Sequence, residues 1–238
     1  MDEAVVKAVA GLRGYGKTSR VLELTRETRR VLYYDSLGDD YSEGVVCRSR
    51  PVLEKLWHAS YRGPFRISYK PVDPVADLPR ICELAYACGD MTLVVDEIQL
   101  YFRGQYCAPE LTKVITGGRH VGLELIGVTQ APKHLGELLR SQAREWFVFA
   151  IREPSHVKYL ADRLVGVDPN LIMNLQKWEY LHYVDGRDYY ERCIDDLARH
   201  KTERPLILAK SCRPAGRPGG SDGTQTPQSE PAGDAPVR

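Results

Sequence analysis

A glycine-rich segment near the start of the chain constrains the fold more than any other feature. Residues 11–18 read Gly-Leu-Arg-Gly-Tyr-Gly-Lys-Thr, between an apolar run at Val5–Ala10 and a helical pattern at Thr18–Arg29. Between a strand and a helix, this spacing of glycine, lysine and threonine predicts a phosphate-binding loop. Glycines let backbone N–H groups converge on phosphate oxygens, and the start of the helix adds the positive end of its dipole.

Each residue type in this segment has a predicted task. The lysine, Lys17, should contact the β- and γ-phosphates of a nucleotide, and the Thr18 hydroxyl should bind Mg²⁺. ATP and Mg²⁺ are therefore the predicted ligands. The predicted nucleotide-binding residues are Gly11, Gly14, Gly16, Lys17, Thr18 and Ser19.

Two carboxylates follow a second apolar run. Residues 92–97 read Thr-Leu-Val-Val-Asp-Glu. At the end of a strand beside the phosphate loop, Asp96 is placed to hold Mg²⁺ through water, and Glu97 to act as general base on the attacking water. The pair favours hydrolysis. A small-molecule or nucleotide kinase is the alternative, and it would need an acceptor pocket and lid within residues 36–66.

A third apolar run, Leu123–Thr129, ends in Thr129-Gln130. We expect this strand to lie between the strands that carry the phosphate loop and Asp96. The amide of Gln130 would then lie beside the γ-phosphate, where it can sense the phosphate or orient the attacking water. The alternative interpretation is a polar pair that caps the helix after Ala131-Pro132.

The remaining pattern predicts an α/β fold with a mainly parallel sheet, because continuous apolar runs are typical of strands buried on both faces. Helices should cover both faces of this sheet. Asp185-Gly186, between the runs Tyr180–Val184 and Tyr189–Cys193, predicts a C-terminal β-hairpin at a sheet edge. The other predicted strands are Val31–Asp35, Arg66–Tyr69 and Trp146–Ile151, and the other predicted helices are Ala76–Cys88, Glu110–Thr116, Lys133–Ala143 and Ser155–Leu164.

Length and composition bound the domain organisation. The chain has 238 residues, which suits one α/β domain; we place it at residues 1–212. Gly, Pro, Ser, Thr and Gln dominate residues 213–238, which predicts a disordered tail.

The net charge of +1 gives no global basic field, so any contact with a polyanion must come from a local patch. No apolar run approaches the roughly 20 residues that span a bilayer, so we expect a soluble, cytoplasmic protein without a membrane segment.

The order of these motifs resembles the HerA/FtsK superfamily of DNA-pumping ATPases. The order is GxxGxGKT, then VVDE, then GGRHVGLELIGVTQAP, then RSQA and a strand. The resemblance covers about Val5 to Cys193. Within the superfamily, the chain most resembles the compact packaging ATPases of membrane-containing, double-jelly-roll viruses of the tectivirus type. Zot-like proteins of filamentous phages are a near relation, although they carry a membrane segment that this sequence lacks.

The resemblance implies a P-loop NTPase fold of the ASCE, RecA-like type, with Walker A at residues 11–18 and Walker B at Asp96–Glu97. It implies ATP hydrolysis coupled to movement of double-stranded DNA into a capsid, in the host cytoplasm or on the virion. The partners would be further copies in a pentameric or hexameric ring, duplex DNA, and capsid or vertex proteins. A Zot-like phage assembly or secretion ATPase is the alternative.

Two further groups of residues are candidate functional residues, the first from the resemblance and the second from the residue pattern itself. Arg119 matches the basic residue before the sensor strand and is the first candidate for an arginine finger that reaches a neighbour's ATP, with Arg140 and Arg152 in reserve. The aromatic and basic segment after Glu97 is the candidate DNA contact, because arginines near aromatic rings contact phosphates and sugars without reading sequence. Its predicted contact residues are Tyr101, Phe102 and Arg103.

Overall fold

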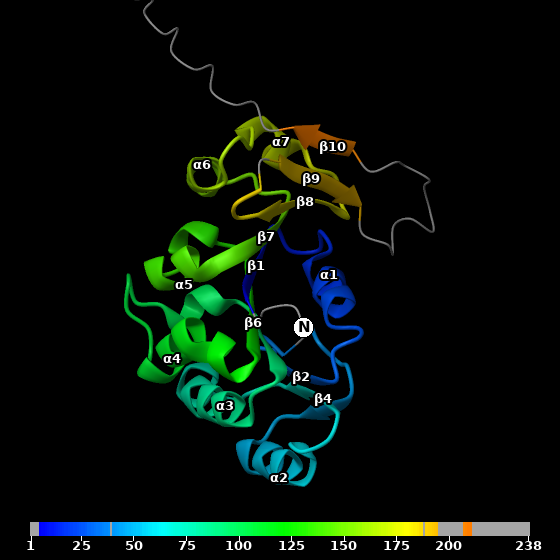
Figure 1. Cartoon of the computed structure of the whole chain (residues 1–238), viewed down its shortest axis with the longest axis vertical. Coiled ribbons are helices and arrows are strands. Elements are labelled where there is room, and N and C mark those ends of the chain that lie inside the picture. Colours follow the sequence, from blue (N-terminus) through cyan, green and yellow to red (C-terminus); the bar gives the residue numbers. More distant parts are fainter. Residues whose placement is uncertain (1–4, 39, 188, 195–206, 211–238) are drawn as a thin grey trace, which may run out of the picture.

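A single mixed sheet organises the protein. The computed structural model describes residues 5–38, 40–187, 189–194 and 207–210, and within them ten strands pair in the order β10-β9-β8-β7-β1-β6-β5-β2-β4-β3 (Figure 1). The strands from β7 through to β3 run parallel to one another, and β8, β9 and β10 continue the sheet in antiparallel fashion. The strands are β1 (Val6–Ala10), β2 (Arg30–Tyr34), β3 (Val45–Cys47), β4 (Phe65–Tyr69), β5 (Met91–Val95), β6 (Leu123–Thr129), β7 (Ala143–Phe149), β8 (Glu179–Val184), β9 (Tyr189–Ile194) and β10 (Ile207–Lys210).

Helices cover the two faces unequally (Figure 1). The helix after β1, α1, packs Val21 on one face with Val9, Val31 and Phe149. The other described α-helices pack on the opposite face, where a larger cluster gathers buried side chains from all of them. The helices are α1 (Lys17–Leu24), α2 (Arg50–Ser60), α3 (Pro74–Cys88), α4 (Pro109–Gly117), α5 (Glu137–Gln142), α6 (Pro154–Arg163) and α7 (Pro169–Asn174), with short 3₁₀ turns η1 (Ile98–Tyr101), η2 (Gly118–Val121) and η3 (Pro132–His134).

Burial on both faces explains the continuous apolar runs in the sequence. In β1, Ala8 and Ala10 face the larger cluster while Val9 faces the smaller one, and all three are fully buried. The same alternation holds in β5, where Leu93 and Val95 face the larger cluster and Val94 faces the smaller one. The predicted α/β fold with helices on both faces is confirmed.

Several predicted boundaries were wrong. The first helix was predicted to reach Arg29 but ends at Leu24, because the Thr25 hydroxyl turns back to the Val21 carbonyl at 2.8 Å and also bonds the Tyr33 hydroxyl. The segment predicted as one helix over 133–143 is instead η3 followed by α5, and β7 already begins at Ala143.

Other elements were not predicted at all, or lie elsewhere than expected. Strand β3, helix α2, helix α7 and strand β10 are absent from the sequence-based prediction. The predicted hairpin is present as β8 and β9, but β10 pairs outside β9 and takes the edge of the sheet. The predicted tail at 213–238 lies outside the described residues. No helix in the described part of the chain has the length and hydrophobicity needed to cross a bilayer.

Candidate active site

Three parallel strands bring the predicted motifs to one edge of the sheet. Strand β6 lies between β1 and β5, as predicted. Its register pairs Thr129 with Ala10 of β1, and Gly127 with Val95 of β5. The phosphate loop, the Asp96–Glu97 pair and Gln130 each follow the last residue of one of these strands. They therefore share the carboxyl edge, where ligands bind in open α/β sheets.

The phosphate loop needs its glycines for steric reasons. Gly11 and Gly16 have φ angles of 153° and 117°, which side chains rarely tolerate. A Cβ atom on Gly11 would lie 2.5 Å from the Phe149 Cβ, and one on Gly16 would lie 2.8 Å from the Trp178 ring. The Gly11 N–H donates to the Thr129 carbonyl at 3.1 Å, which holds the loop to β6. Any substitution at either glycine would displace the loop.

Lys17 begins helix α1 and is 8% exposed. Its Nζ donates to the Leu12 carbonyl at 3.1 Å, across the loop. Burial lowers its pKa, and the nearby charges of Glu97 and Asp96 oppose that shift. A buried ammonium of this kind is stabilised by an anion beside it. Thr18 and Ser19 follow in the first turn of α1, so the predicted binding residues are contiguous at the start of this helix.

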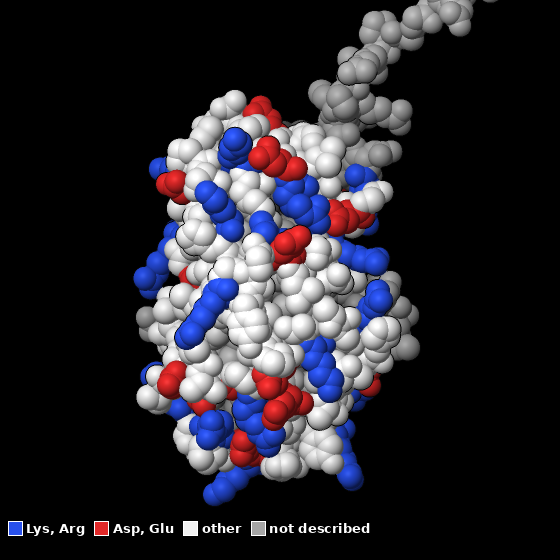
Figure 2. Space-filling model, turned by 90° about the vertical axis from the view of Figure 1, so that its left-hand side faces the viewer, with Lys and Arg blue, Asp and Glu red and all other residues white. Residues whose placement is uncertain are grey.

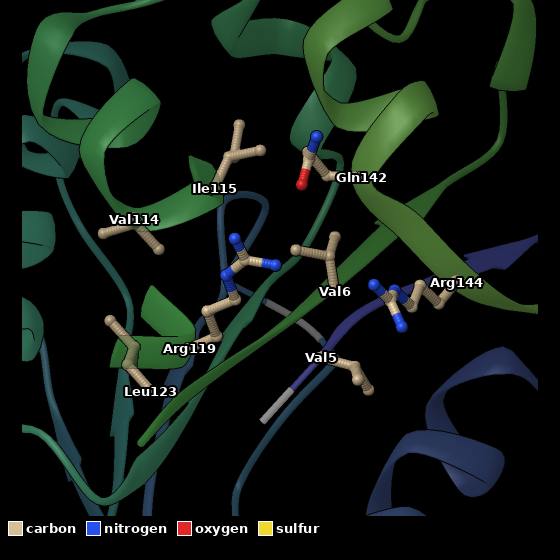
Figure 3. Close-up of a pocket in the computed structure, with 8 residues that line it drawn as sticks. All are labelled: Val5, Val6, Val114, Ile115, Arg119, Leu123, Gln142 and Arg144. Carbon is tan, nitrogen blue, oxygen red and sulfur yellow. The ribbon is translucent and has the colours of Figure 1, made fainter. Parts of the chain in front are cut away.

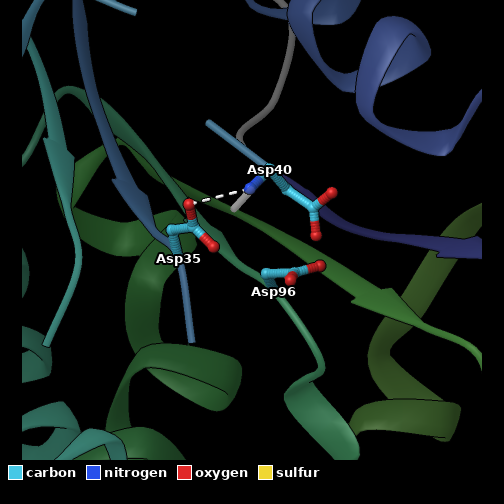
Figure 4. Close-up of side chains that lie close together, drawn as sticks. All are labelled: Asp35, Asp40 and Asp96. Carbon is cyan, nitrogen blue, oxygen red and sulfur yellow. Dashed lines mark hydrogen bonds between the residues drawn. The ribbon is translucent and has the colours of Figure 1, made fainter. Parts of the chain in front are cut away.

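Asp96 is one of three aspartates that converge on this edge (Figure 4). One carboxylate oxygen from each of Asp35, Asp40 and Asp96 lies within 4.8 Å of the others. Asp96 is 3% exposed, and its Oδ2 has no hydrogen-bond partner. Burial, and then the charges of Asp40, Glu97 and Asp35, raise the pKa of Asp96 to about 8. A buried, unsatisfied carboxylate among like charges fits a hard divalent cation, which prefers oxygen ligands.

Asp35 and Asp40 differ in their surroundings. Asp35 is fully buried; it accepts hydrogen bonds from the backbone of Gly38, Asp40 and Tyr41 at 2.9–3.1 Å and pairs with Lys70 at 3.4 Å. It thereby fixes the loop after β2 and brings the exposed Asp40 toward Asp96 (Figure 4). Sequence reasoning missed both residues. The signal was available, because Asp35 directly follows an apolar strand, as Asp96 does.

Glu97 is held in an unusual backbone conformation with its carboxylate ordered. Its φ of 46° is left-handed, a region that residues with side chains seldom occupy outside functional sites. The Gln130 amide donates to Glu97 Oε1, and the Gln99 amide donates to Oε2. The structure thus joins Glu97 and Gln130, which are 33 positions apart in the chain. The capping interpretation applies to Thr129, whose hydroxyl accepts the Ala131 N–H at 2.9 Å.

The predicted arginines lie in three different places. Arg119 lies at the amino end of β6, beside a small pocket lined in part by Val6, Gln142 and Arg144 (Figure 3). The seven residues of β6 separate it from the phosphate loop by about 20 Å, so it cannot reach its own chain's nucleotide. Arg152 lies at the phosphate edge and donates to the Tyr15 hydroxyl at 3.1 Å. Arg140 lies in α5 over the Tyr159 ring.

The predicted DNA-contact residues divide between the core and the surface. Tyr101 and Phe102 are each 9% exposed, and the Tyr101 hydroxyl bonds Ser36 at 2.6 Å. Their rings pack in the core, so they are not available for stacking on bases in this conformation. Arg103 is exposed, and so is Tyr106 at 65%; a backbone bridge joins these two residues. Of this surface pair only Arg103 was a predicted contact residue. Tyr106 was missed because the sequence does not show which aromatic rings enter the core.

The fold and this edge together define a P-loop NTPase architecture, and comparisons with known proteins agree. The sequence matches no protein-family model and no curated protein. The structure is similar to the genome packaging NTPase B204 from Sulfolobus turreted icosahedral virus 2 in complex with ATPγS, with a TM-score of 0.65, 17% identity, and coverage of 81% of this chain and 97% of B204.

A second solved structure has the same fold. The bacterial conjugative coupling protein TrwBΔN70 has a TM-score of 0.54 and 12% identity, with coverage of 77% of this chain and 83% of TrwB. At these identities the likeness establishes the fold. This fold is the one that the sequence resemblance implied.

Proposed function

We propose that this protein is an ATPase that couples hydrolysis to movement of double-stranded DNA, as a genome-packaging motor that acts on a capsid. The observation that carries the hydrolytic part is the contact of Glu97 with Gln130 beside the phosphate loop. A carboxylate whose two oxygens are held by amides is oriented to take a proton from a water that attacks the γ-phosphate. The similarity to the B204 packaging NTPase supports the motor part.

The roles of the remaining residues follow from their positions. Lys17 would neutralise charge on the β- and γ-phosphates, and backbone N–H groups from Gly14 to Ser19 would hold the phosphate oxygens. The predicted Gly11 would shape the loop instead, because its N–H donates to the Thr129 carbonyl. Thr18 and Asp96 would hold Mg²⁺, and the unpartnered Asp96 Oδ2 supports that assignment. When bound, Mg²⁺ would neutralise charge that develops on the phosphate oxygens. Gln130 would position the water and respond to loss of the γ-phosphate.

Hydrolysis suits this site better than phosphoryl transfer to a bound acceptor. The kinase alternative requires an acceptor pocket in residues 36–66. Those residues instead contribute the loop fixed by Asp35, strand β3, and helix α2, whose Trp57 packs against Phe65 with ring centroids 5.2 Å apart. A Zot-like assembly or secretion ATPase remains the second candidate; it would respond to a coat protein or membrane rather than to duplex DNA.

The surface charge offers no broad basic patch on the face drawn in Figure 2, so we place the proposed DNA contact on a short segment. On the face drawn in Figure 2, basic and acidic side chains are interspersed and leave a belt with few charges. A motor of this type would contact the phosphate backbone through one loop per subunit around a ring. The exposed Arg103, with Tyr106 beside it, is the proposed contact, and capsid or vertex proteins are the proposed docking partners.

An ATPase assay with and without duplex DNA tests this function. We expect phosphate release from ATP and Mg²⁺, and stimulation by duplex DNA that Arg103→Ala weakens. Arg26→Ala is the comparison for the DNA-dependent part, because it removes an exposed arginine in the turn between α1 and β2, at the opposite edge of the sheet. ATP hydrolysis that no duplex DNA stimulates, but a coat protein does, would favour the Zot-like candidate.

The proposed ring can be tested with mixed subunits. Arg119 is too far from its own phosphate loop, so an arginine finger here must act on a neighbour; fingers supplied in trans contribute about 10³–10⁵ in rate in related chemistry. Arg119→Ala should bind ATP and hydrolyse it poorly. Mixing it with Lys17→Ala subunits should restore activity at some subunit borders. Absence of rescue in variants shown to co-assemble would remove Arg119 from this role.

A further inference from the structure

We infer that Trp178 is the nucleobase-binding residue of this site and stacks on the base of the bound nucleotide, an assignment that rests on the proposed ATPase function. Trp178 lies in the short turn between α7 and β8. Its indole lies against the phosphate loop. A Cβ built on Gly16 would lie 2.8 Å from the Trp178 Cε3 atom and 3.0 Å from the Phe149 ring.

The topology places Trp178 on the side of the phosphate loop where a base must lie. Glu97 and Gln130 mark the γ-phosphate end, and they follow β5 and β6, on one side of β1. The nucleoside is at the other end of the triphosphate, so it extends to the opposite side of β1. That side carries β7 and β8, with Phe149 paired to Tyr180, so the start of β8 lies at the phosphate edge. Trp178 directly precedes this start.

The backbone of Trp178 is held in place by the loop that it contacts. Its N–H donates to the Tyr15 carbonyl at 3.0 Å, which ties the turn to the phosphate loop. Its φ is 73°, left-handed for a residue with a large side chain. Backbone strain of this kind persists only where the surrounding structure enforces it, and strained residues are common at ligand-binding sites. Glycine would adopt this turn without strain, so the presence of tryptophan calls for a role of the ring.

The indole also has a face that an external group can approach. Trp178 is only half-buried, and the Lys177 ammonium lies 5.1 Å from the ring centroid. Lys177 is exposed, so its side chain can move aside and leave this face of the ring to a planar base. Tyr15 is the aromatic residue of the phosphate loop itself, and its hydroxyl accepts a hydrogen bond from Arg152. Stacking tolerates any base, so the inferred subsite would accept adenine and guanine alike.

Binding of ADP and of inorganic tripolyphosphate, both with Mg²⁺, separates the base from the phosphates. Loss of base–aromatic stacking costs about 5- to 150-fold in affinity. Trp178→Leu keeps an apolar group against Gly16 without an aromatic face. We expect it to weaken ADP binding by that factor and to leave tripolyphosphate binding unchanged, while Trp178→Phe restores most of the ADP affinity.

Tryptophan fluorescence gives an independent readout. The chain has three tryptophans, and Trp57 and Trp146 are 4% and 0% exposed. Quenching by ADP should therefore persist in Trp57→Phe, the matched control, and disappear in Trp178→Phe, whose melting temperature verifies folding. Unchanged ADP affinity in Trp178→Leu, or equal losses for ADP and tripolyphosphate, would overturn the stacking role and leave the proposed function intact. Failure of the wild-type protein to bind ADP would overturn both.

Discussion

Two aspartates occupy equivalent places in the fold and have opposite surroundings. Asp35 follows β2 and Asp96 follows β5, and these strands are direct neighbours in the sheet. Asp35 is fully buried, with three backbone N–H donors and Lys70 around its carboxylate. Asp96 is also buried, yet its Oδ2 has no partner and its strongest neighbours are other acids.

This difference indicates that two aspartates at one edge of the sheet have different roles: Asp35 stabilises a loop, and Asp96 is available to bind a ligand. A carboxylate that accepts all its hydrogen bonds from the protein stabilises a loop and has no lone pair left for a ligand. A buried carboxylate left unsatisfied costs stability until a cation arrives. The loop after β2 therefore serves to position Asp40, while the segment after β5, which continues into Glu97, keeps its acids for ligand and water. Four experiments test this division.

Of these four, the largest effect should come from Glu97. Glu97→Gln keeps the shape and the approach of the Gln130 amide but removes the base, so hydrolysis should fall by about 10²–10⁴-fold. ATP should remain bound, as isothermal titration can verify. Gln99→Ala is the matched control, because it removes the other amide partner of Glu97 and leaves the base in place. Hydrolysis at the parental rate in Glu97→Gln would place water activation elsewhere.

Asp35→Asn should give the next largest effect, on stability. The change leaves Lys70 buried without its anion and turns an amide N–H₂ toward backbone donors. Removing one partner of a buried ion pair costs about 3–5 kcal/mol of unfolding free energy. Denaturant unfolding at equilibrium, without nucleotide or Mg²⁺, measures it. A loss smaller than that of an average surface substitution would show that the loop after β2 is held by its other contacts.

Asp96→Asn is the counterpart and should not destabilise the ligand-free protein. It removes a carboxyl group whose ionised form is repelled by Asp40, Glu97 and Asp35, and which therefore holds a proton in the ligand-free protein below about pH 8. The free energy of unfolding without Mg²⁺ should stay equal or rise. Its cost should appear only with the cation: Mg²⁺-dependent nucleotide affinity and hydrolysis should both fall. If both Asp96→Asn and Asp35→Asn destabilise the ligand-free protein to the same extent, the two loops do not divide the work as argued.

The contrast also shows where prediction from sequence ends. The phosphate loop, Asp96, Glu97, the sheet class and the hairpin could be predicted, because each depends on local pattern and on which strands end at a shared edge. The expected strand order placed Gln130 at the same edge as Glu97, but the hydrogen bond between them was not predicted. Strand β3, with three residues, is too short for a periodic signal.

Packing decided what the local pattern could not. Tyr101 and Phe102 have the same sequence signature whether they enter the core or face solvent. Asp35 has hydrogen-bond donors around its carboxylate because the loop after β2 turns back and brings the Asp40 N–H, five residues later, to it. Within the described part of the chain Asp96 lacks such a loop, and no periodicity in the sequence shows this difference.

The smallest predicted effect is a pH dependence that belongs to Asp96 alone. Its folded-state pKa is raised from 3.8 to about 8, so between these values the ligand-free protein holds a proton that the unfolded chain releases. The contribution of Asp96 to stability should therefore decline as pH rises from about 4 to 8 and level off above. Mg²⁺ competes with that proton, so its affinity should increase by up to about tenfold per pH unit below pH 8. Mg²⁺ titrations at pH 6, 7 and 8, in the wild type and in Asp96→Asn, measure the slope. An equal slope in the variant would assign the proton to another acid of the cluster, and a flat wild-type profile would mean that Asp96 is already ionised before the cation binds.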